Sequence, residues 1–247
     1  MKNNLVLQLI GIKKYFGGVK ALDGIDFELR EGETVSLLGD NGAGKSTLIK
    51  IITGVHRPDE GNIYISGKKI DKLNPKLARE KYNIETVFQD LALFDLLDIS
   101  ANLFIGKEIK WGPFLNQKKM DRLSLELLNK TGILLGGRLR QQVRWLSGGQ
   151  QHAVAICRSV YSGKDFFKKI ILMDEPTAGL GVKETGKLLD MIKNLKEEGH
   201  SVIFITHTFE HALKVSDRYV VFRSGKKVGE RLKGETDSKE LIHLMVG

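Results

Sequence analysis

Short apolar runs alternate along the chain with segments in which apolar residues recur at helical spacing. The runs at 170–173 ("IILM") and 202–205 ("VIFI") are apolar at consecutive positions, which is typical of central parallel strands covered by helices on both faces. Between them, residues 183–198 have the spacing of an amphipathic helix, with Gly199 as its stop. This alternation predicts an α/β fold built around a parallel sheet.

The same pattern predicts the other elements of the fold. We expect helices over 46–54 and 183–198, and strands over 5–12, 24–30, 33–38, 61–67, 169–176, 201–207 and 218–225. The first two strands are expected to form an antiparallel flank. Together these elements predict central parallel strands with an antiparallel β flank.

The segment from 90 to 162 has a different pattern. Residues 121–132 carry Leu123, Leu127 and Leu128 on one helical face, and the stretch that begins at Ser147 continues as a helix. We interpret this segment as a mostly helical insertion. The predicted organisation is one domain over 1–247, with a core from 1–89 and 163–247 and an inserted subdomain at 90–162.

Composition limits the classes of protein to which the chain can belong. It has 247 residues, 41% of them hydrophobic, which is enough to bury a core. The start lacks the cleavage site of a signal peptide, and no apolar stretch approaches the roughly 20 residues of a membrane-spanning helix. The single cysteine excludes an intramolecular disulfide. We therefore expect a soluble, cytoplasmic protein.

The charge balance is basic, with 39 Lys and Arg against 30 Asp and Glu and a formal net charge of +9. The basic residues occur in scattered pairs such as Lys68-Lys69 and Lys118-Lys119, and they do not alternate with aromatic residues. This distribution is typical of solvated surface. No nucleic-acid partner is expected.

A glycine-rich loop lies between the strand expected at 33–38 and the helix expected at 46–54. It reads "GDNGAGKST", the full G-x-x-x-x-G-K-S pattern of a phosphate-binding loop. The glycines allow positive φ angles that turn backbone amides toward phosphate oxygens, Lys45 adds a positive charge, and the hydroxyl of Ser46 suits Mg²⁺. The predicted binding residues are Gly39, Asp40, Asn41, Gly42, Ala43, Gly44, Lys45, Ser46 and Thr47.

Charged and titratable side chains follow two of the buried strands. Asp174 and Glu175 come directly after 170–173, and His207 ends the strand at 201–207. Strand geometry brings these residues to one edge of the sheet, beside the glycine loop. Asp174 is predicted to hold Mg²⁺ through water and Glu175 to act as general base. His207 would contact the terminal phosphate and orient the attacking water.

Two further residues are candidates for nucleotide contacts. Gln89, in "VFQD", stands where the core passes into the helical segment, and its neutral amide suits Mg²⁺ or a water bound to it. Phe16 would stack on the adenine, since an aromatic face accepts any base. The alternative puts Phe16 in the core and leaves Tyr15 to stack.

The stretch "LSGGQQHA" at 146–153 allows two interpretations. Ser147 and Gln150 have the spacing of a capping box for the following helix. The pair Gly148-Gly149 suggests more, because glycine in a helical turn costs about 0.5–1 kcal/mol relative to alanine and is retained where something approaches the backbone closely. An anion at this helix N-terminus is the second interpretation.

In the order "GDNGAGKST", "VFQD", "LSGGQ", "ILMDEP" and "ITH", the sequence resembles the ATPase subunit of ATP-binding cassette (ABC) transporters over nearly its whole length. The resemblance implies a P-loop NTPase core with a mixed central sheet, an antiparallel β flank and a helical ABC subdomain. It also implies a head-to-tail homodimer that binds two Mg-ATP. Each ATP would lie between the Gly39–Thr47 loop of one copy and Ser147, Gly148, Gly149 and Gln150 of the other.

The segments "VFQDLALFDLLDISANLFIG" and "DEPTAGLGVKET" are similar to the ATPases of bacterial simple-sugar importers, of the ribose, xylose and fructose type. This implies separate membrane permease subunits, a solute-binding protein and a location on the inner face of the membrane. The segment from Leu91 to Gly106 would form the groove that binds the permease, unless its apolar residues are simply core. Where many cassettes have an aspartate, this chain has Gly181. An exporter ATPase and a soluble ABC-type ATPase on nucleic acid are the alternatives.

Overall fold

The computed structural model describes residues 4–88, 90–130, 138–160 and 168–247, which form two compact units. The first unit contains Met1–Thr86, Lys168–Glu175 and Leu195–Gly247, and the second contains Val87–Phe167 and Pro176–Asn194. The second unit thus includes 176–194 as well as the predicted insertion at 90–162, whose boundaries stay a prediction. None of the helices among the described residues is both long and apolar enough to cross a membrane.

The main sheet of the first unit is mixed. Among the described residues its strand order is β12-β11-β3-β10-β9-β6, and β11, β3, β10 and β9 run parallel while β12 is antiparallel to β11. The strands are β3 (Thr34–Gly39), β6 (Ile84–Val87), β9 (Ile170–Asp174), β10 (Ser201–Ile205), β11 (Arg218–Arg223) and β12 (Lys226–Leu232). The apolar runs of the sequence are therefore central parallel strands, as predicted.

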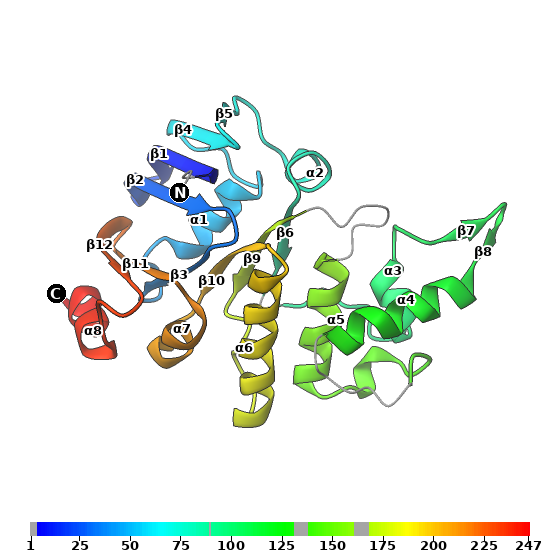
Figure 1. Cartoon of the computed structure of the whole chain (residues 1–247). Coiled ribbons are helices and arrows are strands. Elements are labelled where there is room, and N and C mark those ends of the chain that lie inside the picture. The colour runs from blue at the N-terminus through cyan, green and yellow to red at the C-terminus, as the bar shows by residue number, and fades with distance from the viewer. Residues whose placement is uncertain (1–3, 89, 131–137, 161–167) are drawn as a thin grey trace. The chain divides into compact units, whose positions relative to one another are not determined.

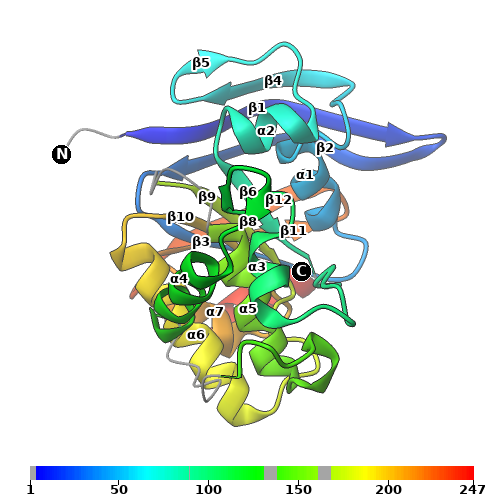
Figure 2. The same cartoon turned by 90° about the vertical axis from the view of Figure 1, so that its right-hand side faces the viewer.

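A second, antiparallel sheet in the same unit has the order β2-β1-β4-β5 (Figure 1). Its strands are β1 (Leu5–Phe16), β2 (Val19–Arg30), β4 (Glu60–Ile65) and β5 (Lys68–Lys69). Figure 2 shows β1 and β4 side by side at the top of the view, with β5 beside β4. The predicted antiparallel flank is confirmed.

Each face of the main sheet packs against a different layer. On one face, Val35 and Leu37 of β3 share a core with the antiparallel sheet and with Leu48 and Ile52 of α1 (Lys45–Ile52). On the other face, Leu38 packs in a cluster with residues of α7 (Phe209–Val215) and α8 (Ser238–Val246). This two-sided burial is the physical reason for consecutive apolar residues in β3.

A further short helix, α2 (Pro75–Glu80), is capped by the side chain of Asn74.

Where the structure describes it, the second unit is helical apart from one short hairpin. Its elements are α3 (Ile99–Phe104), β7 (Lys110–Trp111), β8 (Phe114–Leu115), α4 (Gln117–Lys130), a 3₁₀ turn (Val143–Trp145), α5 (Gly148–Val160) and most of α6 (Val182–Glu197). Residues of α3, α4 and α5 share one apolar core that includes Leu103, Leu127 and Cys157. Cys157 is buried and its thiol contacts the carbonyl of Leu127. It is a core residue, as the apolar stripe of α5 indicates.

Candidate functional site

The glycine loop connects the carboxyl end of β3 to α1, as predicted. Gly39, Gly42 and Gly44 all have positive φ, at 147°, 79° and 103°. At Gly39 a Cβ would lie 2.3 Å from the carbonyl oxygen of Phe222, and at Gly44 it would lie 2.6 Å from that of Ala21. Two of the glycines are thus fixed by close backbone approach as well as by their φ angles.

Lys45 is buried within this loop. Its ammonium donates hydrogen bonds to the carbonyl of Gly39 at 2.7 Å and of Asp40 at 2.9 Å. Burial lowers the pKa of Lys45, and the nearby carboxylates of Glu175 and Asp174 oppose that shift. A charge held this way is ready to bind an anionic oxygen, because it is already desolvated and can exchange its bonds to these two carbonyls for bonds to the anion.

Asp174 ends β9 and lies beside the start of α1. Burial raises the pKa of Asp174, and a hydrogen bond from the hydroxyl of Ser46 and the charge of Lys45 act against that shift. A carboxylate and a hydroxyl in contact are oxygen donors of the kind that Mg²⁺ prefers, together with water and phosphate. The two residues therefore fit the predicted metal, although the described residues hold no cluster of three His, Cys, Asp or Glu that would bind one alone.

Glu175 has an unusual backbone for a non-glycine residue, with φ at +50°. Left-handed φ values of this kind concentrate at functional sites, because the surroundings must hold them. Its amide donates to the carbonyl of Ile205 at 3.1 Å, which fixes the residue at the end of β10. The side chain therefore turns away from the direction that a continuing strand would give it.

The carboxylate of Glu175 faces His207. Its Oε2 lies 2.9 Å from Nδ1 of His207. Oε2 is buried and the described residues give it no hydrogen bond of good geometry. Buried polar atoms are rarely left without a partner in proteins. An oxygen in this position suits a water molecule, which is what a general base for hydrolysis must hold.

The parallel sheet brings these groups together. β10 lies between β3 and β9, and all three strands run in the same direction. Their carboxyl ends therefore carry, side by side, the loop with Lys45, His207 after β10, and Asp174-Glu175 after β9. This is the end of an α/β sheet at which ligands bind. The arrangement can hold a phosphate chain with a metal and place a base beside it.

Phe16 lies at the end of β1 and is 45% exposed. Its ring contacts His56 edge-on, with the ring centroids 5.2 Å apart, and the ammonium of Lys14 lies 5.5 Å from its centroid. The alternative that buries Phe16 in the core is wrong. Stacking on adenine stays a prediction, and no sequence pattern indicated the neighbouring His56.

Ser147 and Gln150 lie in the second unit and make the predicted capping box. The amide of Ser147 donates to Oε1 of Gln150 at 3.0 Å, and the amide of Gln150 donates to Oγ of Ser147 at 3.4 Å. The close approach that the glycine pair indicated comes from the same unit. A Cβ at Gly149 would lie 2.7 Å from Cγ of Glu184 on α6, and one at Gly148 would lie 3.2 Å from Leu180. Contact of this motif with an anion stays a prediction.

Of the two remaining positions singled out in the sequence, Gln89 and Gly181, the structure describes only Gly181. Gln89 lies outside the described residues. Gly181 is exposed, and a Cβ there would meet only the carboxylate oxygen of Glu184, at 2.7 Å. That oxygen is the end of a flexible side chain, so the backbone at Gly181 can carry a larger residue.

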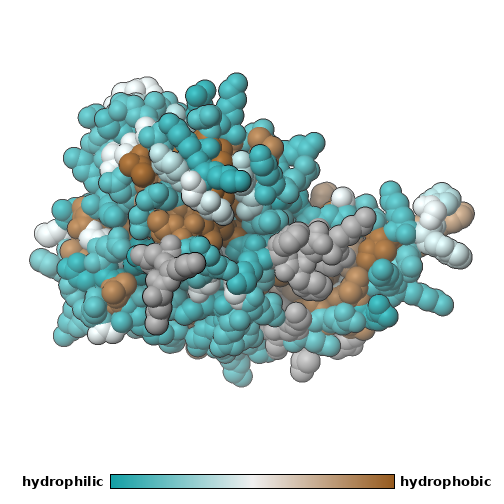
Figure 3. All heavy atoms as spheres, turned by 45° about the horizontal axis from the view of Figure 1, so that its top comes forward, coloured by the Kyte–Doolittle hydropathy of each residue, from teal (hydrophilic) through white to brown (hydrophobic). Residues whose placement is uncertain are grey.

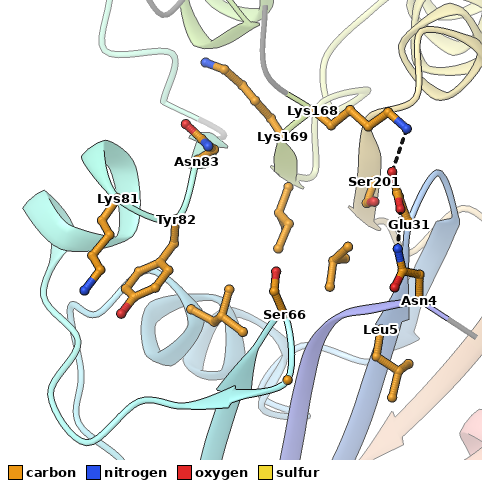
Figure 4. Close-up of a pocket in the computed structure, with 14 residues that line it drawn as sticks. Asn4, Leu5, Glu31, Ser66, Lys81, Tyr82, Asn83, Lys168, Lys169 and Ser201 are labelled. Atoms are coloured by element: carbon orange, nitrogen blue, oxygen red, sulfur yellow. Dashed lines mark hydrogen bonds and ion pairs between the residues drawn. The ribbon is translucent and has the colours of Figure 1, made fainter. Parts of the chain in front are cut away.

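A separate pocket of about 560 Å³ lies at the opposite end of the sheet, where β9 and β10 begin (Figure 4). Glu31 at its wall accepts hydrogen bonds from Lys168 at 2.6 Å and from Asn4 at 2.8 Å. None of the predicted phosphate-site residues lines this pocket.

The model of the ABC transporter family matches residues 22–178, which is more than half of the chain. The chain belongs to the ABC transporter family. The matched region contains the glycine loop, Asp174 and Glu175, and the predicted ABC-type ATPase is thereby confirmed at the level of the family.

Several relatives of this ABC protein have names that refer to sugars. It is 46% identical to a xylose/arabinose import ATP-binding protein of Sulfolobus acidocaldarius, over 97% of this chain and 93% of the relative. It is 39% identical to a fructose import ATP-binding protein of Rhizobium meliloti, over 92% and 88% of the two chains. A galactofuranose transporter ATP-binding protein of Escherichia coli is 41% identical over 98% of this chain, which spans 47% of that relative's length.

Solved structures of ATP-binding cassettes have the same fold. One, in an ADP conformation, has a TM-score of 0.83 and 28% identity and covers 98% of this chain and 99% of its own. Another, a dimeric post-hydrolysis state bound to ADP and Pi, has a TM-score of 0.77 and 28% identity over 93% of this chain and 100% of its own. The predicted α/β cassette fold is therefore confirmed.

Proposed function

We propose that the protein is the ATP-hydrolysing subunit of a transporter that imports a monosaccharide through separate permease subunits. The observation that carries the hydrolysis is the meeting of the glycine loop, Asp174 and Glu175 at one edge of the sheet. The direction and the substrate class rest on the names of the xylose/arabinose and fructose relatives, which this chain matches along most of their length.

The chain's own groups would bind the triphosphate at the start of α1. Backbone amides of the loop and the ammonium of Lys45 would bind the β- and γ-phosphates, with Lys45 exchanging its carbonyl partners for phosphate oxygens. Ser46 and Asp174 would hold Mg²⁺, which when bound neutralises charge on the phosphates. Gln89 would be an additional ligand. Phe16 would stack on the adenine.

Hydrolysis needs a base next to the terminal phosphate. A water molecule at the buried Oε2 of Glu175 would attack the γ-phosphorus and give its proton to that carboxylate, while the bond to the β-phosphate oxygen breaks and ADP leaves. His207, whose Nδ1 lies beside the same oxygen, would orient the water and contact the γ-phosphate. The products are ADP and inorganic phosphate.

A second copy of the chain would complete each site. At the start of α5, Ser147 is exposed and Gln150 is half-exposed. Their hydrogen bonds to each other use the amides of Ser147 and Gln150, so the amides of the two glycines between them would be the ones to bind an anion. In a head-to-tail homodimer this terminus would face the γ-phosphate bound by the other copy. A related cassette is dimeric in a post-hydrolysis state bound to ADP and Pi.

The contact with the permease would use the segment that leads into α3. Phe94, Leu96 and Leu97 are exposed there, whereas Leu103 belongs to the core of the second unit. The buried amide side chain of Asn102 bonds both the amide and the carbonyl of Phe94, at 2.8 and 3.0 Å, and so fixes the shape of this turn. The exposed part of 91–106 is thus a preformed apolar surface. At that surface the protein would lie on the inner face of the membrane.

Transport by a reconstituted complex tests this function. The test uses vesicles with the cassette and ATP inside and the solute-binding protein outside. Through the permease, these vesicles should accumulate labelled xylose, ribose or fructose. A complex with Glu175→Gln serves as the matched control and should accumulate none. ATP-dependent release of solute, or hydrolysis that no sugar stimulates, would contradict import of a monosaccharide.

A further inference from the structure

The hairpin β7–β8 projects from the second unit, beyond the ends of α3 and α4 (Figure 1). It forms a sheet of its own, in which Lys110 pairs with Leu115 and Trp111 pairs with Phe114. Gly112, with φ at +59°, makes the turn. An isolated two-stranded hairpin of this length has little stability of its own in water. Among the described residues, β7 and β8 pair only with each other, so no larger sheet accounts for their apolar side chains.

The end of the hairpin is strongly apolar and exposed. The exposed fractions are 81% for Trp111, 73% for Phe114 and 53% for Leu115. Because Trp111 and Phe114 are direct cross-strand partners, their side chains lie on the same face of the hairpin. In Figure 3 pale and brown spheres mark the outer end of this projection. Two neighbouring exposed aromatic side chains of this kind indicate a contact site.

Cationic side chains flank the apolar end. The stretch from 106 to 120 contains Lys107, Lys110, Lys118 and Lys119 against the single acidic residue Glu108. Lys110, Lys118 and Lys119 are exposed. They stand beside the stems of the hairpin and at the start of α4, whereas the aromatic residues stand next to the turn. The projection is thus layered, apolar at its end and basic behind it.

We propose that this hairpin inserts its end into the surface of an anionic lipid bilayer. Trp111 and Phe114 would enter the boundary between head groups and acyl chains, where amphipathic aromatic rings concentrate. The lysines behind them would contact anionic head groups. The layering favours lipid over a protein partner, since it matches the order of polarity with depth in a membrane. The hairpin contains none of the predicted nucleotide-binding residues and lies outside the proposed permease surface at 91–106.

The two tryptophans of the chain, Trp111 and Trp145, allow a direct test. Trp145 is also exposed, at 66%, and lies on the 3₁₀ turn outside the hairpin. A Trp145→Phe protein reports only on Trp111, and a Trp111→Phe protein reports only on Trp145. Each is mixed with vesicles of phosphatidylcholine containing phosphatidylglycerol and brominated acyl chains, and then with vesicles of phosphatidylcholine alone.

Insertion predicts that emission from Trp111 shifts to the blue and is quenched by the brominated anionic vesicles, that salt reduces the quenching, and that Trp145 is not quenched. Absence of quenching, or equal quenching of both tryptophans, overturns the proposal.

A sedimentation assay with the same vesicles gives a second measurement. The double variant Trp111→Ser/Phe114→Ser should bind anionic vesicles about tenfold more weakly than wild type, because it loses both apolar anchors. The matched variant Trp145→Ser should bind as wild type does. ATP hydrolysis by all variants in solution should be unchanged and reports that they are folded. Unchanged lipid binding by the double variant, with a loss only of permease-coupled transport, would assign the hairpin to a protein contact and overturn the lipid assignment.

Discussion

Replacing Gly149 by alanine tests why the "LSGGQ" motif needs its second glycine. The new Cβ would lie 2.7 Å from Cγ and 2.9 Å from Cβ of Glu184, well inside an ordinary contact. Forcing a methyl into packed space costs about 1–3 kcal/mol, whereas alanine is better than glycine in a helix by about 0.5–1 kcal/mol. The difference between these two ranges is about 0–2.5 kcal/mol, so we expect Gly149→Ala to lower the free energy of unfolding by about 1 kcal/mol.

Removing the obstructing side chain should reverse the sign of this effect. In a Glu184→Gly background the nearest remaining atom of residue 184 is Cα, 3.7 Å from the new Cβ. There Gly149→Ala should raise the free energy of unfolding by about 0.5–1 kcal/mol, the helix preference alone. Urea unfolding of the four proteins of this double-mutant cycle, followed by circular dichroism, measures both values. Equal destabilisation in the two backgrounds would refute the packing argument.

The remaining predictions concern catalysis and pH. Glu175→Gln should bind ATP and accumulate as a dimer while turnover falls about 10²–10⁴-fold, the usual contribution of a general base; normal turnover in a steady-state assay would refute its role. Ser147→Arg should abolish hydrolysis but leave ATP binding by the monomer intact, as measured by fluorescent nucleotide titration, whereas lost binding would place that motif in its own chain's site. Burial of His152, whose Nδ1 lies 2.9 Å from the carbonyl of Gly148, lowers its pKa below 6.5. The unfolded chain therefore binds more protons than the folded one as pH falls through 6.5, and stability should decrease between about pH 7 and 5. His152→Gln should flatten that slope in urea titrations, and an unchanged slope would assign it to other groups.

The elements best predicted from the sequence are those whose residue pattern has a single physical explanation. The doubly apolar strands and the glycine loop predicted β3, β9 and β10 and the position of Lys45, because burial on two faces and phosphate binding each demand a definite set of residues. Helix ends were less well predicted. The helix expected at 121–132 begins earlier, at Gln117. Its first three residues are polar, so the sequence pattern does not mark where it starts.

Features that depend on contacts distant in sequence were not predictable. The hairpin with Trp111 is local and was missed for another reason, because its strands are too short to show alternation. The left-handed backbone of Glu175 has no sequence signal, because such strain is imposed by surrounding structure. The packing reason for Gly149 lies in Glu184 on another helix, so only the need for a close approach could be inferred, and not what approaches.

The most direct test of the shared site is complementation between two inactive variants. Lys45→Ala removes the phosphate-binding charge, and Ser147→Arg blocks the motif that the other copy would contribute. Each alone should hydrolyse almost no ATP. In an equal mixture about half of the dimers are mixed, and each mixed dimer has one intact site, so activity should recover to about a quarter of wild type. A mixture as inactive as its components, or a Ser147→Arg protein that hydrolyses ATP normally as a monomer, would contradict a site built from two copies.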